Sequence, residues 1–120
     1  MEITRIQSGP RMSQAVVHGG VDQGGTVYLA GQVAADPGAD IKAQTQSVLN
    51  KIDALLGESG TSKANLLQAV IYLSDMRNFQ AMNEVWDAWV EPGNAPGRTT
   101  VEARLARPEV RVEITVIVAL

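Results

Sequence analysis

Cysteine is absent from the 120 residues, and histidine occurs once, as His18. Without cysteine the chain has no disulfide framework, no thiolate nucleophile and no cysteine-based zinc site. A single histidine excludes a site built from several histidine ligands, so we expect no metal site. A Ser-His-Asp triad would depend on His18 alone, and we instead expect this side chain at the surface, beside a glycine-rich loop.

Aromatic residues and positive charge are also scarce: aromatics make up 4% of the chain, and the formal net charge is −3. A nucleic-acid surface is usually basic and clustered, so no nucleic-acid partner is expected. The first residues lack the apolar core of a signal peptide, and no apolar run approaches the roughly 18–20 residues of a membrane span. We therefore expect one cytoplasmic domain over residues 1–120, with no membrane partner.

The end of the chain carries the clearest pattern, because its residues alternate strictly between apolar and polar. One face of the last strand is apolar and consists of Val110, Val112, Ile114, Val116 and Val118. In the preceding strand the apolar face is expected to consist of Thr99, Val101, Ala103 and Leu105, and the polar face of Arg98, Thr100, Glu102 and Arg104. We expect these two strands to pair and to place Arg98 and Glu113 together on the non-core face of one sheet.

The remaining segments predict an α+β fold with a single β-sheet and two helices packed on one of its faces. Expected strands, with a glycine-rich hairpin loop at 19–25, cover residues 3–12, 13–19, 26–33 and 65–74. Expected helices run from the N-cap Asp40 to Gly57 or Gly60, and from residues 75–78 to Pro92. Gly31 marks a bulge or a close backbone approach. The face opposite the helices is half apolar, which favours a homo-oligomer with a closed symmetric interface.

Three side chains have two interpretations each. Arg98 opens a strand after a Pro-Gly turn, where it can hold a carboxylate or form an ion pair with Glu113 or Glu102. Glu113 lies in an apolar strand, where it can orient a water molecule or pair with Arg98 or Arg111. Asn83 lies between two aromatic positions of the second helix, so its amide needs backbone partners or a ligand.

Taken together, the segments resemble the RidA/YjgF family of small trimeric proteins over nearly the whole chain. The similarity rests on SQAVVHGG, VYLAGQV, VLNKIDALLGESG, VIYLSDMRNFQAMNEVWDAW, APGRTTVEARL and VRVEITVIVA. It implies a chorismate-mutase-like fold with a mixed sheet, a homotrimer with a central barrel, and clefts between subunits. It also implies hydrolysis of 2-imino or enamino acids to 2-oxo acids and ammonia, without metal or cofactor.

The resemblance assigns roles to individual residues. Arg98 matches the arginine that binds the substrate carboxylate, and Glu113 matches the glutamate that positions the attacking water. Thr100 and Asn83 match cleft positions. Two cleft positions depart from the family pattern, because Met12 stands where a tyrosine is usual and Ala30 where a serine is usual.

These departures leave other functions open. The same Arg98 would serve a non-catalytic module that binds small carboxylates such as 2-oxo acids or amino acids. Endoribonuclease activity has also been attached to the family, but the acidic composition and the single histidine argue against it.

Overall fold

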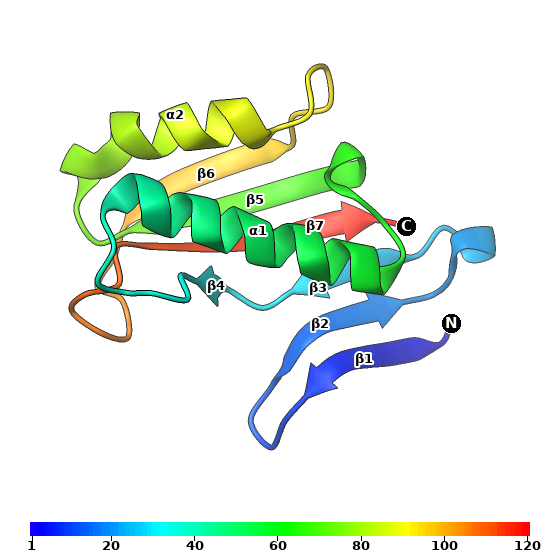
Figure 1. Cartoon of the computed structure of the whole chain (residues 1–120). Coiled ribbons are helices and arrows are strands. Elements are labelled where there is room, and N and C mark those ends of the chain that lie inside the picture. The colour runs from blue at the N-terminus through cyan, green and yellow to red at the C-terminus, as the bar shows by residue number, and fades with distance from the viewer.

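The computed structural model describes residues 1–120, which form a sheet and two long helices (Figure 1). The strands are β1 (Ile3–Ser8), β2 (Ser13–His18), β3 (Thr26–Leu29), β4 (Gln32–Val33), β5 (Leu66–Leu73), β6 (Gly97–Glu102) and β7 (Val112–Ala119). The helices are α1 (Ile41–Ser59) and α2 (Phe79–Trp89), with short 3₁₀ turns at Val21–Gln23, Lys63–Asn65 and Met76–Asn78.

The strands form one mixed sheet in the order β1-β2-β3-β7-β5-β6, and β4 also pairs with β7. β5 and β6 are parallel, whereas the other pairs are antiparallel. The parallel pairing of β5 and β6 follows from α2, because the helix between these two strands returns the chain to the end of the sheet at which β5 begins. Both helices lie on the same face (Figure 1). The α+β fold expected from the sequence is therefore confirmed.

Local sequence sets the ends of α1. The Asp40 side chain accepts a hydrogen bond from the Ala43 N–H (2.9 Å), as an N-cap residue does. Gly57 lies inside the helix, and Gly60 ends it in the left-handed conformation, with φ of 89°. A left-handed glycine is a common helix terminator because it has no Cβ to strain.

The core lies between the helices and the sheet. The apolar face predicted for the last strand is buried there, with Val112, Ile114 and Val118 fully inaccessible. Leu49 and Ile52 of α1 cover them from the helix layer. Neither helix is long and apolar enough to cross a membrane.

The expected pairing of the last two strands is wrong, because β5 lies between β6 and β7. Ala69 of β5 pairs with Val116 on one side and with Arg98 on the other. Residues paired in register project from the same face, so Arg98 shares the helix-covered face with Val116.

The two faces of β6 are consequently the reverse of the expectation. Arg98 and Thr100 are half-buried under the helix layer, whereas Thr99 and Val101 are exposed on the open face. Alternation separates the residues of a strand into two sets but does not say which set faces the core. Residues 103–111 form a loop, so Ala103 and Leu105 do not extend the strand.

Candidate functional site

Glu113 lies on the open face of the sheet, where its carboxylate covers the backbone between β3 and β4. A Cβ atom built on Gly31 would overlap the Glu113 Oε2 atom, so a residue with a side chain at this position would displace the carboxylate. The close approach predicted at Gly31 is thus confirmed, and Glu113 is the group that makes it. β4 resumes directly after this gap and pairs Val33 with Glu113.

The Glu113 carboxylate faces a cavity of about 480 Å³, named here the Glu113 cavity. Its lining residues come from four segments: Leu29, Ala30, Gly31, Tyr72, Ala103, Arg104, Leu105, Ala106, Glu113 and Thr115. The ionisable side chains of the wall are Glu113, Arg104 and Tyr72. The Thr115 hydroxyl donates to the Leu29 carbonyl (2.7 Å). Ala30, a predicted site residue, therefore lies beside Glu113.

Arg98 lies on the opposite face, beneath α2. Its guanidinium carbon is 5.9 Å from the centre of the Phe79 ring and 5.5 Å from that of Trp86. A guanidinium at this distance from an aromatic face gains about 0.5–2 kcal/mol of cation–π attraction. The rings hold the cation in place without neutralising its charge.

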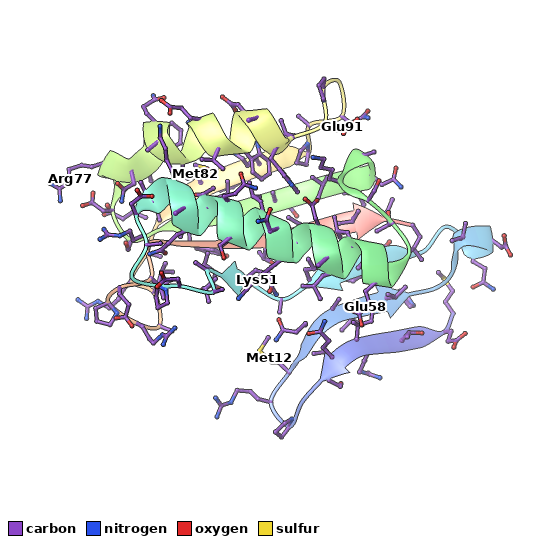
Figure 2. All side chains as sticks on the ribbon, in the orientation of Figure 1. Met12, Lys51, Glu58, Arg77, Met82 and Glu91 are labelled. Carbon is purple, nitrogen blue, oxygen red and sulfur yellow. The ribbon has the colours of Figure 1, made fainter.

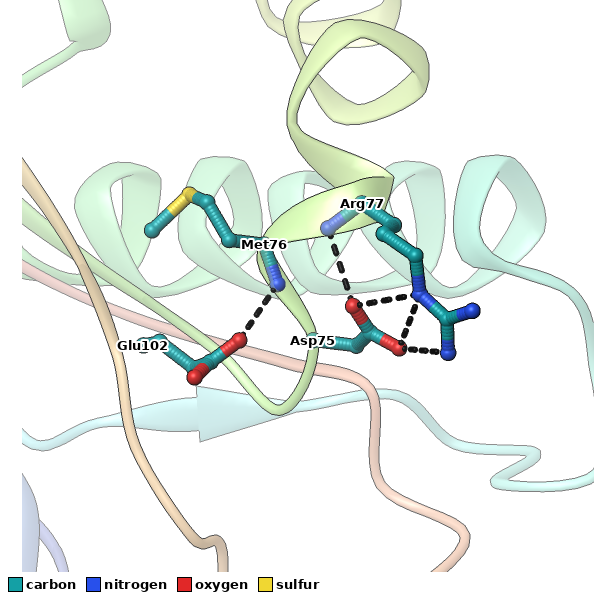
Figure 3. A network of polar contacts seen from close by, with 4 residues as sticks. All are labelled: Asp75, Met76, Arg77 and Glu102. Atoms are coloured by element: carbon teal, nitrogen blue, oxygen red, sulfur yellow. Dashed lines mark hydrogen bonds and ion pairs between the residues drawn. The ribbon is translucent and has the colours of Figure 1, made fainter.

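Neither Arg98 nor Glu113 is consumed by an ion pair. The three salt bridges of the chain join Lys42 to Glu84, Arg77 to Asp75, and Arg107 to Glu109. Glu102, the other partner considered for Arg98, accepts a hydrogen bond from the Met76 N–H at 2.8 Å (Figure 3). Within one chain, the interpretation of Arg98 and Glu113 as structural ion pairs is therefore wrong.

Asn83 and Thr100 add two unpartnered oxygens to the Arg98 side of the sheet. Asn83 lies between Phe79 and Trp86 on the helical face that receives Arg98, and Thr100 is two residues beyond Arg98 on β6. Asn83 Oδ1 and Thr100 Oγ1 are both buried without a hydrogen-bond partner. Buried polar atoms are normally paired, so these two indicate a place for a polar ligand. Arg98, Asn83 and Thr100 are called the α2–β6 cluster below.

One chain does not bring the α2–β6 cluster to Glu113. β6 and β7 are separated by β5, and Glu113 is three residues along β7 from Val116, which is level with Arg98. Strand spacing and rise per residue place the two backbones roughly 14 Å apart, with the side chains on opposite faces. A small substrate cannot touch both groups of the same chain.

Met12 lies at the turn of the β1–β2 hairpin, on the other side of the molecule from Met82 of α2 (Figure 2). It is exposed, and it lines no cavity of the single chain. Sequence reasoning did not find Tyr72 and Arg104, which line the Glu113 cavity. The position of Tyr72 follows from its register with Glu113, which no local pattern reveals.

Candidate metal ligands do not gather in the chain. No group of three or more histidine, cysteine, aspartate or glutamate residues could hold a metal ion. The chemistry available at the site is that of a guanidinium, a carboxylate, an amide and hydroxyl groups.

Comparison with known proteins places this fold in a family. The family model described as Endoribonuclease L-PSP matches residues 5–120. The chain is 42% identical to the RutC family protein YoaB of Escherichia coli K12 over 120 residues, which cover 100% of both chains. It is 43% identical to a RutC family protein of Haemophilus ducreyi over 118 residues, covering 98% of this chain and 97% of that protein.

Solved structures agree with the sequence relatives. The crystal structure of a member of the YjgF protein family from Neisseria meningitidis superposes with a TM-score of 0.90 and 47% identity, covering 98% of this chain and 94% of that one. The match extends over both helices and the whole sheet, which is the chorismate-mutase-like arrangement of this family. The chain belongs to the RidA/YjgF family, which includes the RutC proteins.

Proposed function

We propose that the chain hydrolyses reactive 2-imino and enamino acids to 2-oxo acids and ammonia, as a homotrimer with its sites between subunits. The observation that carries the proposal is the unpaired Arg98 guanidinium, which is held by two aromatic rings beside unpartnered Asn83 and Thr100 oxygens. A guanidinium binds a carboxylate through two parallel hydrogen bonds, and every 2-imino acid carries a carboxylate next to the reacting carbon.

The second half of the site comes from a neighbouring copy. β6 is an edge strand, so a second chain can approach the α2–β6 cluster and present its own Glu113 cavity. The open face that carries Glu113 also exposes Tyr28 and Val101, which suits burial against another subunit. Arg98 of one copy and Glu113 of the next then enclose one substrate.

The chemistry needs only these groups. The imine carbon is already electrophilic, so orientation of the carboxylate and delivery of a water suffice. The Glu113 carboxylate takes a proton from water as the water oxygen bonds to the imine carbon. That proton passes to the imine nitrogen and gives a carbinolamine. The hydroxyl proton of the carbinolamine then moves to the nitrogen through the Glu113 carboxylate, the carbon–nitrogen bond breaks, and ammonia leaves as the carbonyl forms. One water is consumed for each 2-oxo acid and ammonia released.

The test is a coupled assay in which a dehydratase generates 2-iminobutanoate or 2-iminopropanoate and release of the 2-oxo acid is followed. The chain should accelerate release, and Arg98→Ala should lower kcat/KM at least about 100-fold because both charge-assisted hydrogen bonds are lost. Arg98→Lys should restore part of the activity, and Arg5→Ala, an exposed arginine of β1, should retain all of it. An Arg98→Ala protein that folds and keeps the full rate would overturn the proposal.

Mixing variants tests the shared site. Arg98→Ala and Glu113→Gln chains should each be inactive alone. Mixed oligomers from equal amounts should recover about a quarter of the sites, because random assembly pairs an intact Arg98 with an intact Glu113 at that frequency. No recovery from verified mixed oligomers would mean that the two residues do not act across subunits.

A non-catalytic carboxylate-binding module is the second candidate. Met12 favours it, because a thioether stands where the family pattern has a tyrosine hydroxyl. In that case 2-oxobutanoate should raise Tm through Arg98 without any turnover of the imine. RNA cleavage, the activity in the family model's description, is the weakest candidate for a chain with a net charge of −3.

A further inference from the structure

The segment 103–106 separates two cavities, and Arg104 lines both. One is the Glu113 cavity. The other, of about 590 Å³, is lined by Ser74, Glu102 and residues 103–108. Arg104 is the only cationic side chain in the wall of the Glu113 cavity. Arg104 is therefore the one cation that shares this cavity with Glu113 of the same chain, whereas Arg98 lies on the other face.

Hydrogen bonds hold the loop that carries Arg104 at both ends. The Ala103 N–H donates to the Leu73 carbonyl (2.9 Å), one residue before Arg104. At the far end the buried Gln44 side chain donates to the Glu109 carbonyl (3.0 Å) and accepts from the Arg111 N–H (2.9 Å). Both ends of the loop that carries Arg104 are thus held by contacts within the chain.

The Arg104 guanidinium has no acidic partner within the chain. The neighbouring Arg107 lies 3.8 Å from the Glu109 carboxylate, and Glu102 accepts the Met76 N–H. No salt bridge or hydrogen bond involves the Arg104 side chain. Arg104 therefore differs from Arg107 of the same loop in two ways: it is unpaired, and it lines the Glu113 cavity.

The composition of the cavity wall indicates what Arg104 binds. Apart from Arg104 and Glu113 the wall is mostly apolar or small, with Leu29, Ala30 and Leu105 among its residues. A short hydrocarbon chain suits such a wall, and an anionic group at the end of that chain would reach the guanidinium. Without Arg104 that anion would only meet the repulsion of Glu113.

We propose that Arg104 binds a second, distal carboxylate of the substrate, so that the preferred substrates are 2-imino acids with an acidic side chain. The inference rests on the function proposed above, in which Arg98 of a neighbouring copy binds the carboxylate next to the imine carbon. Arg104 is then a specificity-determining residue of the same site. It selects among imines and takes no part in the hydrolytic step.

The experiment compares two imines made in situ by amino-acid oxidases, one from glutamate and one from 2-aminobutanoate. The wild-type kcat/KM should favour the acidic imine by about 10-fold or more. Arg104→Gln should lower kcat/KM for the acidic imine about 10- to 100-fold and leave the neutral imine within about 2-fold, because only one substrate loses a charge-assisted contact. Arg107→Gln is the matched control and should change neither value.

A binding measurement avoids dependence on turnover. The product analogue 2-oxoglutarate should raise Tm more than 2-oxobutanoate at equal concentration, and Arg104→Gln should remove the difference. Equal or greater activity of the wild type on the neutral imine would overturn the inference, as would an equal loss of both activities in Arg104→Gln. Either result leaves the proposed function standing as long as Arg98→Ala still abolishes hydrolysis of the neutral imine.

Discussion

Two polar groups under the helices, Gln44 and the α2–β6 cluster, differ in how fully their hydrogen-bonding atoms are used. The Gln44 side chain is fully buried, and its nitrogen donates to the carbonyls of Pro37, Ala39 and Glu109 at 2.9–3.0 Å. Its oxygen accepts the Arg111 N–H. In the α2–β6 cluster, by contrast, the Asn83 and Thr100 oxygens are buried without partners.

The difference agrees with a structural role for Gln44 and with the binding role proposed for the α2–β6 cluster. A satisfied buried amide fixes the backbone around it, and Gln44 joins the loop before α1 to the loop before β7. A buried oxygen without a partner costs about 1–3 kcal/mol, so it lowers the stability of the chain that keeps it. That cost is recovered when a ligand or a second subunit supplies the missing hydrogen bond.

The largest expected effect comes from breaking the satisfied group. Gln44→Leu leaves three carbonyls and one N–H without their partner and should lower the free energy of unfolding by about 3 kcal/mol or more. Urea denaturation would measure it. Gln46→Ala, an exposed glutamine of α1 that bonds only Asn50, should stay within about 0.5 kcal/mol of the wild type. Equal losses in the two variants would mean that Gln44 does not join the loops.

A pair of threonines sharpens the comparison. Thr100→Val removes a hydroxyl without a partner and should raise the free energy of unfolding by about 1 kcal/mol while lowering activity. Thr45→Val removes a buried hydroxyl that donates to the Ile41 carbonyl at 2.7 Å. This variant should lower the free energy of unfolding by about 0.5–1 kcal/mol. Opposite signs in denaturation are the expected result. A stability loss at Thr100 with unchanged activity would make that hydroxyl structural.

The sequence predicts the elements of this fold better than their arrangement. Asp40 and Gly60 are local signals, and each lies where a helix end requires it. The strict alternation of apolar residues in β7 identifies it as a core strand. Its neighbours β3 and β5 also contribute buried residues. β6 has an equally regular alternation, yet its polar set faces the helices, because its register with β5 puts Arg98 and Thr100 beside the buried Ala69 and Ile71.

The residues of the candidate site were therefore predicted from the sequence, but their arrangement in space was not. Arg98, Glu113, Asn83, Thr100 and Ala30 were found by type and by family resemblance, and their roles stay predictions. Their division between two faces of the sheet depends on β5 lying between β6 and β7. That strand order is set by contacts between residues far apart in the sequence. Arg104 was missed because nothing local distinguishes it from Arg107.

The smallest expected effect concerns a polar pair that is satisfied but exposed. At the 3₁₀ turn before α2, the side chain of Arg77 donates hydrogen bonds to the Asp75 carboxylate, which also accepts the Arg77 N–H (Figure 3). These contacts, the side-chain one first, lower the pKa of Asp75 to about 2. An aspartate in an unfolded chain has a pKa of ~3.9. The ionised Asp75 therefore stabilises the folded chain fully above that pH, and this stabilisation is lost as the pH falls through about 2.

Asp75→Asn should therefore lower Tm only slightly near neutral pH, by about 2 °C or less, because solvent screens an exposed pair. The difference from the wild type should shrink as the pH is lowered toward the pKa of about 2. Arg77→Ala should show a similar pH dependence, since it removes the main cause of the lowered pKa. Thermal melts followed by circular dichroism at neutral and acid pH would measure both. A Tm difference that stays constant with pH would mean that ionisation of Asp75 adds nothing to the stability of the folded chain.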